Sequence, residues 1–210
     1  MKIAIKSLTY LLHTHELGIT FNRFSEGKPI LIGWSDSAFK DDVKTGRSTA
    51  GYSIGFKGSG PMITKTRLTK TVSLSSCEAE LKALTDCVRK VMWFRHIMEE
   101  MKLPMLTATD IIRPTLIMED NQSAIAIAKN PITTERSEHI DVREFYCREM
   151  AQTDQIRIQY IQTNKMIADM LTKPLPLDKV RIFRKAIMDG SDVIIKETTK
   201  PAYTKKKQKQ

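Results

Sequence analysis

The sequence predicts an α/β domain in which helices pack on a five-stranded mixed sheet. Three strand-like segments are followed by a long helix-like segment and then by further strands and helices. The strand, long helix and strand in the middle predict two parallel strands, joined by a right-handed crossover. The chain has 210 residues, 41% of them hydrophobic, which suits one domain with additional segments at its ends.

Strands are predicted where apolar and β-branched residues gather between turn signals. The first strand, "KPILIGWSD", is apolar on both faces up to Gly33. "STAGYSIGF" is the second, and "GSGP" predicts a turn before the third, "MITKTRL", so these three are expected to form an antiparallel meander. "RPTLIMED" and "IRIQYIQ" complete the set. The predicted strands cover residues 28–36, 48–56, 62–68, 113–120 and 156–162.

Helices are predicted where apolar residues recur at spacings of three and four. In the longest, Ser75 and Glu78 have the spacing of a capping box. Pro131 ends a shorter helix, and "PLP" closes the one that follows the fifth strand. The predicted helices cover residues 2–17, 75–102, 121–130, 137–151, 164–173 and 177–188.

These elements predict four parts of the chain. Residues 1–27 form a connector helix, 28–176 the α/β domain, 177–190 a C-terminal helix and 191–210 a basic, disordered tail. No apolar run in the sequence is long enough to cross a bilayer, and the first 21 residues are not typical of a signal peptide. We therefore expect no membrane partner and no secretion.

The net charge is +10, and more than half of it lies near the C-terminus. Residues 174–210 contain ten Lys and Arg against four Asp and Glu, and five lysines but no acids follow Thr198. A basic surplus favours a polyanionic partner such as nucleic acid. For the tail alone, a solvated segment without a partner fits the composition equally well.

Glu80 is an unexpected residue in the long helix. At about 100° per residue, it lies on the same apolar stripe as Leu84 and Val91. Taken alone, it fits an ion pair at the edge of the core. Asp36 and Asp120, however, end the first and fourth predicted strands, and parallel strands bring such ends to one crevice. The three carboxylates are therefore expected to meet there.

The same motifs contain no Lys or Arg that would be expected to compensate these carboxylates, so a divalent cation is the expected partner. Carboxylate oxygens suit Mg²⁺ or Mn²⁺. Asp169, in the otherwise apolar "IADML", is the candidate fourth ligand. By itself, a lone helical aspartate is more often a solvated side chain.

Six segments resemble, in order and spacing, the ribonuclease H domain of copia-type retrotransposon Pol polyproteins. They are "GWSDSAF", "GRSTAGYSIGF", "VSLSSCEAELKAL", "MEDNQSAIAIAKNP", "SEHIDVREFYCREM" and "QYIQTNKMIADMLTKPL". The resemblance covers about residues 2–188 and implies a ribonuclease H fold. The first helix resembles the segment that joins the reverse transcriptase to this domain. The resemblance thus implies the reverse transcriptase domain of the same polyprotein as a partner.

The resemblance also implies an activity, the hydrolysis of the RNA strand of an RNA–DNA hybrid by two Mg²⁺ ions, for which Mn²⁺ can substitute. The four metal-binding acids of the family correspond to Asp36, Glu80, Asp120 and Asp169. Asp36 would bridge both ions, Glu80 and Asp120 would complete one site, and Asp169 the other. The implied location is the cytoplasm, within virus-like particles, or the nucleus.

Two residues next to these acids, Ser76 and Gln122, are candidates for contacts to the 2′-hydroxyls of the RNA strand. The sequence departs from related families in two places. Ala38 stands where copia-type domains often have a second acid, and "QTNKMI" lacks the histidine of cellular ribonucleases H. We interpret His139 as a packing or capping residue.

Three alternatives stay open at this stage. A catalytically silent remnant would bind only nucleic acid or a partner polymerase. An integrase-like transferase would share the fold, but the acids are separated by 44, 40 and 49 residues with a glutamate second, which is the ribonuclease H arrangement. A purely structural connector would be expected to lose the acids, and all four are present.

Overall fold

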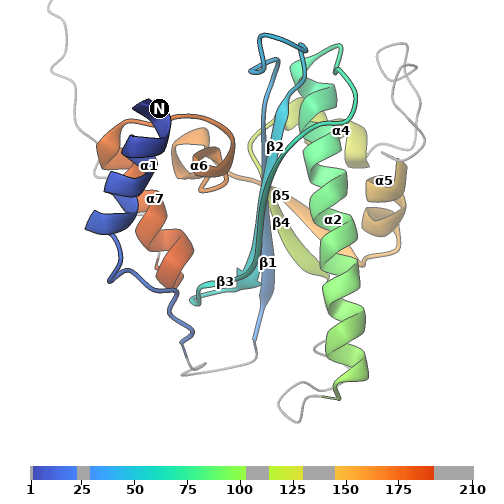
Figure 1. Cartoon of the computed structure of the whole chain (residues 1–210). Coiled ribbons are helices and arrows are strands. Elements are labelled where there is room, and N and C mark those ends of the chain that lie inside the picture. The colour runs from blue at the N-terminus through green and yellow to red at the C-terminus, as the bar shows by residue number, and fades with distance from the viewer. Residues whose placement is uncertain (1, 23–28, 103–113, 130–144, 192–210) are drawn as a thin grey trace, which may run out of the picture.

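The computed structural model describes residues 2–22, 29–102, 114–129 and 145–191 (Figure 1). Its centre is a five-stranded sheet in the order β3-β2-β1-β4-β5. The first three strands pair antiparallel, and β1–β4 and β4–β5 pair parallel, which confirms the predicted mixed sheet and the ribonuclease H-like fold class. The strands are β1 Leu31–Ala38, β2 Thr49–Phe56, β3 Pro61–Leu68, β4 Thr115–Glu119 and β5 Ile156–Tyr160.

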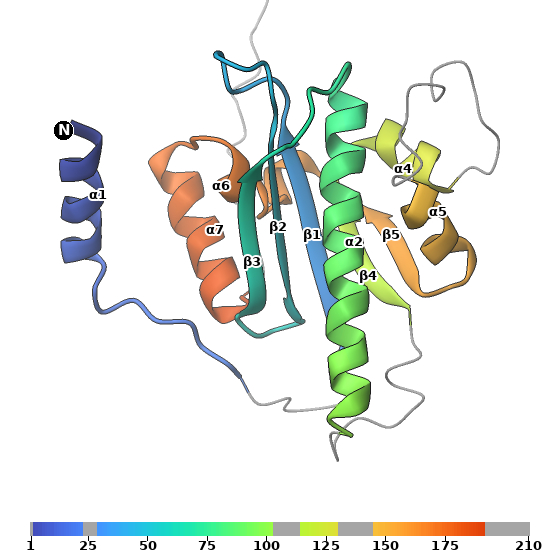
Figure 2. The ribbon, with the colours of Figure 1, turned by 45° about the vertical axis from the view of Figure 1, so that its right-hand side comes forward.

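Helices cover both faces of this sheet (Figures 1 and 2). The helices α2, α4 and α5 lie on one side, and α6 and α7 lie on the other. No helix within the described residues is long and apolar enough to cross a bilayer. The helical elements are α1 Lys2–His13, α2 Ser76–Glu100, α4 Gln122–Lys129, α5 Phe145–Gln152, the 3₁₀ turn η3 Thr163–Lys165, α6 Asp169–Thr172 and α7 Leu177–Asp189.

The long helix α2 begins with the predicted cap. The Ser75 hydroxyl accepts a hydrogen bond from the Glu78 N–H at 3.1 Å, and the Glu78 carboxylate accepts one from the Leu74 N–H at 2.6 Å. The first bond satisfies a backbone donor that the first turn of a helix leaves without a partner, and the second holds Leu74, the residue before the cap. The position of this cap fixes where α2 starts, and with it the direction in which Glu80 points.

Helix α2 packs closely on the centre of the sheet. Cys87 and Val91 are fully buried against β1, where Gly33 leaves room for the helix. A Cβ at Gly33 would lie 3.1 Å from the Cys87 Sγ and 3.0 Å from the Ile117 Cδ1. The odd-numbered residues of β1 around Gly33 therefore face α2, and the even-numbered ones face the opposite side, because side chains alternate along a strand.

Two predicted helices differ from the structure, and part of a third lies outside the described residues. The helix predicted at residues 164–173 is divided into η3 and α6, with the backbone of Met166 extended between them. Met166, Ile167 and Ala168 are all buried, and three consecutive side chains cannot lie on one face of an α-helix. The first helix ends at His13 rather than at residue 17, shortly before Gly18, a weak helix former. Of the helix predicted at 137–151, residues 137–144 with His139 lie outside the described residues, as does most of the predicted tail.

The segment after α1 lies beside the C-terminal end of α7. The Thr20 N–H donates to the Met188 carbonyl at 2.8 Å, and the Gly60 N–H donates to the Thr20 carbonyl at 2.9 Å. Helix α1 itself lies apart from the sheet (Figure 2). Its apolar side chains are exposed, with Leu8 61% and Leu12 72% exposed. The stripe predicted from the sequence therefore does not join the core of this domain.

Candidate active site

The parallel pairing of β1 and β4 brings two aspartates to one end of the sheet. Trp34 pairs with Met118, and continuing this register by two residues places Asp36 level with Asp120. Asp36 lies two residues before the end of β1 rather than at its end, as the sequence had suggested, because β1 continues to Ala38. Its side chain is fully buried and points away from α2, toward α6.

Three aspartates form a group on this side of the sheet. One carboxylate oxygen from each of Asp36, Asp120 and Asp169 lies within 4.8 Å of the other two. Asp169 is the first residue of α6 and is almost completely buried. The extended backbone at Met166 turns the chain so that α6 starts next to β1. The break in the predicted helix therefore sets the position of Asp169.

A second group lies on the side of α2. One carboxylate oxygen from each of Glu80, Glu119 and Asp120 lies within 4.8 Å of the other two. Glu80 is only 7% exposed and points inward from the first turns of α2, in the direction that the helical stripe predicted. Asp120 belongs to both groups. The structure thus places the four predicted acids around the ends of β1 and β4.

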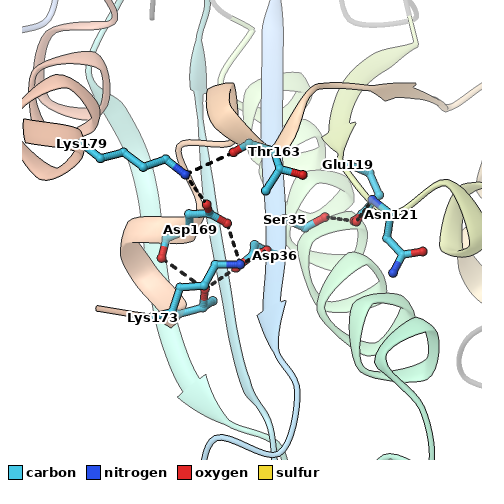
Figure 3. Close-up of polar contacts among 9 residues, drawn as sticks. Ser35, Asp36, Glu119, Asn121, Thr163, Asp169, Lys173 and Lys179 are labelled. Carbon is cyan, nitrogen blue, oxygen red and sulfur yellow. Dashed lines mark hydrogen bonds and ion pairs between the residues drawn. The ribbon is translucent and has the colours of Figure 1, made fainter. Parts of the chain in front are cut away.

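Glu119 is a member of this cluster that the sequence analysis missed. It is fully buried and accepts hydrogen bonds from the Ser35 hydroxyl at 2.9 Å and from the Asn121 N–H at 3.2 Å (Figure 3). Like Ile117 two residues before it, Glu119 faces α2. The alternation of side chains along the fourth strand was the signal that could have revealed Glu119, because it points every second residue toward α2.

Two lysines contact the acids, so the expectation that no basic residue compensates them was wrong (Figure 3). The Lys173 Nζ lies 2.8 Å from Asp169 Oδ1 and 3.4 Å from Asp36 Oδ1. The Lys179 Nζ lies 2.8 Å from Asp169 Oδ2. Lys173 stands one helical turn after Asp169, a spacing that could have revealed it. Lys179 belongs to α7 and is brought near only by the packing of α7 beside α6.

Burial dominates the electrostatics of the cluster. It raises the pKa of Asp36 to about 6, although Lys173 and a hydrogen bond from the Thr172 hydroxyl act in the opposite direction. Burial, followed by the neighbouring Glu119, Asp36 and Asp120, raises the pKa of Glu80 well above its ordinary value. Burial also raises the pKa of Glu119, against the effect of its hydrogen-bond donors. The site thus holds more carboxyl groups than its two lysines neutralise.

These side chains fit a divalent cation. The Glu80 Oε2 is buried and has no hydrogen-bond partner within the part of the chain that the structure describes. Burying a carboxylate oxygen without a partner raises the free energy of the folded state unless another group compensates the oxygen. Carboxylate oxygens gathered within 4.8 Å of one another are the ligands that hard cations such as Mg²⁺ and Mn²⁺ prefer.

The two candidate substrate contacts lie at helix starts beside the acids. Ser76 is the first residue of α2 and Gln122 the first residue of α4, and both are exposed. Asn121 caps α4 by accepting the Ala124 N–H at 3.0 Å, which fixes where that helix begins. Both side chains are therefore accessible to a polymer bound over the acid cluster.

The chain is similar in sequence to Pol polyproteins of plant transposons. No family model matches the chain. It is 32% identical over 164 residues to the retrovirus-related Pol polyprotein from transposon TNT 1-94 of Nicotiana tabacum, covering 78% of the chain and 12% of that protein. It is 28% identical over 169 residues to the corresponding polyprotein from transposon RE1 of Arabidopsis thaliana, covering 80% and 11%.

Solved structures similar to the chain include two ribonucleases H. One is LC11-RNase H1 isolated from compost, with a TM-score of 0.49 and 12% identity, covering 68% of this chain and 92% of that one. Another is RNase H1 from Halobacterium salinarum, with a TM-score of 0.46 and 14% identity, covering 70% and 95%.

The strand order, the strand directions and the helices on both faces define a ribonuclease H-like domain. The chain belongs to the retrovirus-related Pol polyproteins of transposons, as the resemblance of its motifs implied. It spans only about a tenth of the length of these relatives.

Proposed function

We propose that this chain hydrolyses the RNA strand of RNA–DNA hybrids during the reverse transcription of a copia-type retrotransposon. The observation that carries the proposal is the buried carboxylate cluster at the ends of β1 and β4, with an oxygen of Glu80 that lacks a hydrogen-bond partner among the described residues. The relationship to Pol polyproteins of transposons supports the biological setting.

Asp36, Asp120 and Asp169 would hold one divalent cation, and Glu80, Glu119 and Asp120 would hold a second. Such ions, Mg²⁺ or Mn²⁺, supply an activated water and stabilise the charge on the leaving oxygen when bound. The neighbouring residues fix the ligands. Ser35 and the backbone of Asn121 hold Glu119 in place beside Glu80 by hydrogen bonds.

The substrate would lie over this cluster, with its minor groove toward α2 and α4. Ser76 and Gln122 are proposed to contact 2′-hydroxyls, which is how a protein distinguishes RNA from DNA at a given site. Exposed lysines and arginines would hold phosphates without reading the sequence. The sequence-predicted tail would add affinity of this non-specific kind.

The reverse transcriptase domain of the same polyprotein is the proposed protein partner. We propose that residues 1–27 lead to it, that residues 28–176 form the catalytic domain, and that residues 177–190 and 191–210 complete it. The exposed apolar side chains of α1 agree with a connecting role. The cytoplasm, within virus-like particles, or the nucleus is the proposed location.

The proposal is tested by incubating a strand-labelled RNA–DNA hybrid with Mg²⁺ and either the wild-type chain, Asp36→Asn or Asp178→Asn. Asp178 is a matched control, since its side chain is 93% exposed on α7. We expect cleavage of the RNA strand alone, a loss of at least about hundredfold in Asp36→Asn, as for strongly perturbed metal sites, and wild-type rates in Asp178→Asn. A chelator should abolish cleavage.

A second candidate function is a remnant that binds hybrid or polymerase without cleaving. The contact of both Asp169 oxygens with lysines favours it, because these ion pairs supply the carboxylate with positive charge without a metal. A folded chain that binds the hybrid but does not cleave it in Mg²⁺ or Mn²⁺ would contradict the proposal for the isolated chain. Adding the polymerase segment back then distinguishes a remnant from a domain that needs its partner.

A further inference from the structure

The two oxygens of Asp169 are paired with two different lysines. Lys173 Nζ lies 2.8 Å from Oδ1 and Lys179 Nζ lies 2.8 Å from Oδ2 (Figure 3). The Asp169 side chain is almost completely buried, so these ammonium groups are poorly screened by solvent. A divalent cation that binds this carboxylate would therefore be repelled by the ammonium groups beside it.

Lys179 is held in place by more than Asp169. Its ammonium also donates to the Thr163 carbonyl at 3.3 Å and lies 4.9 Å from the centre of the Phe183 ring. Phe183 is fully buried, and it belongs to the same helix, α7. Moving Lys179 away would thus break three contacts at once.

Lys173 is the more exposed of the two. Its ammonium contacts the carboxylates of Asp36 and Asp169, and its side chain is 35% exposed against 26% for Lys179. It stands at the C-cap of α6, and its flexible four-carbon stem can carry the ammonium into solvent. Lys173 is therefore the lysine that can leave when a cation arrives.

The Lys173 ammonium lies against two of the three aspartates that would hold a cation. Asp36, Asp120 and Asp169 place oxygens within 4.8 Å of one another, and Lys173 pairs with two of them. A cation and this ammonium would both lie against the Asp36 and Asp169 carboxylates and would repel each other at that separation. The two positive groups therefore exclude each other.

We propose that Lys173 is an internal competitor for the divalent cation, which has to displace its ammonium from Asp36 and Asp169 before it binds. This inference rests on the proposed function and adds to it how the site admits its metal. Lys173 holds the two aspartates together in the absence of metal and weakens the affinity for the cation. Lys179 stays on Asp169 and keeps its carboxylate oriented toward the site.

The test is a calorimetric titration of Mn²⁺ into the full chain, comparing wild type, Lys173→Met and the exposed control Lys129→Met on α4. We expect Lys173→Met to bind Mn²⁺ at least about fivefold more tightly, the lower end of usual coupling between two ligands of one protein. In EDTA it should melt at a lower temperature than wild type, because two buried carboxylates lose their counter-ion. Lys129→Met should match wild type in both measurements.

Should Lys173→Met fail to fold, Lys173→Gln is the second probe, since its neutral amide can still donate hydrogen bonds to the aspartates. Unchanged or weaker Mn²⁺ affinity in the folded neutral variant overturns the inference. If wild type binds Mn²⁺ and cleaves the hybrid in that case, the proposed function stands. A wild-type chain that binds no Mn²⁺ and cleaves nothing would contradict both.

Discussion

The carboxyl group of Glu80 is buried beside other carboxyl groups, and this lowers the stability of the folded chain when Glu80 is ionised. Burial and the proximity of Glu119 raise the pKa of Glu80, so the folded chain keeps a proton that the unfolded chain releases near pH 4.3. A group whose pKa is higher in the folded state stabilises the fold at low pH and loses that contribution as the pH rises. Without metal, the stability of this domain should therefore fall as the pH rises from about 4.3 toward the raised pKa of Glu80, which is about 10.

The substitution Glu80→Gln tests how much the ionised Glu80 carboxylate destabilises the fold. We expect the variant to melt at least about 2–4 °C above wild type at pH 8 in EDTA, a shift that corresponds to about 1 kcal/mol for a chain of this size. The difference should shrink at pH 5, where Glu80 is protonated in wild type. Thermal denaturation at both pH values measures it, with the exposed Glu100→Gln as control. A variant less stable than wild type at pH 8 would show that the Glu80 carboxylate is well compensated.

Single residues also show what the sequence could and could not predict about the site. Asp36, Glu80 and Asp120 follow from strand ends and a helical stripe, which are local patterns. Glu119 was missed although strand alternation indicates its direction. Lys179 could not be predicted, because its contact with Asp169 depends on how α7 packs, and nothing in the sequence near either residue encodes that packing.

At the scale of elements, α6 is positioned by its contact with β2. Gly51 in β2 has no side chain, and a Cβ there would lie 2.8 Å from the Leu171 Cβ and 2.8 Å from the Thr172 Cγ2. The Thr66 hydroxyl of β3 also donates to the Leu171 carbonyl at 2.9 Å. This close approach places Asp169 next to Asp36.

We therefore expect Gly51→Ala to displace α6. Overpacking of this kind costs about 1–3 kcal/mol, and the displaced Asp169 should weaken Mn²⁺ binding as well. Thermal denaturation and Mn²⁺ titration measure the two effects. Gly18→Ala is the matched control, because a Cβ at Gly18 meets nothing within 4 Å. Wild-type stability and Mn²⁺ affinity in Gly51→Ala would mean that the close contact does not position α6.

The elements differ in how well their patterns predicted them. All five strands and the cap of α2 were predicted, since alternation, turn residues and the capping box are local signals. The break between η3 and α6 was not, because Met166, Ile167 and Ala168 are buried by the tertiary fold and read as a helix from spacing alone.

At the scale of the whole molecule, the two helical layers meet at the acid cluster. Asp120 follows the C-terminal end of β4 and lies between Glu80 from one layer and Asp169 from the other. That β4 runs parallel to β3 could be predicted, because the long helix α2 joins these two strands as a crossover. The place of β4 beside β1 comes from the observed pairing of the strands. The position of α1 could not be predicted, since its apolar stripe predicts burial without saying against which surface.

The central claim is that this cluster holds divalent cations for the hydrolysis of RNA, and anomalous diffraction from crystals soaked in Mn²⁺ with RNA–DNA hybrid bound tests it most directly. The predicted result is two manganese peaks, one beside Asp36 and Asp169 and one beside Glu80, with Lys173 displaced into solvent. The contradicting result is an ordered cluster at saturating Mn²⁺ without any peak, in which Lys173 still pairs with both aspartates.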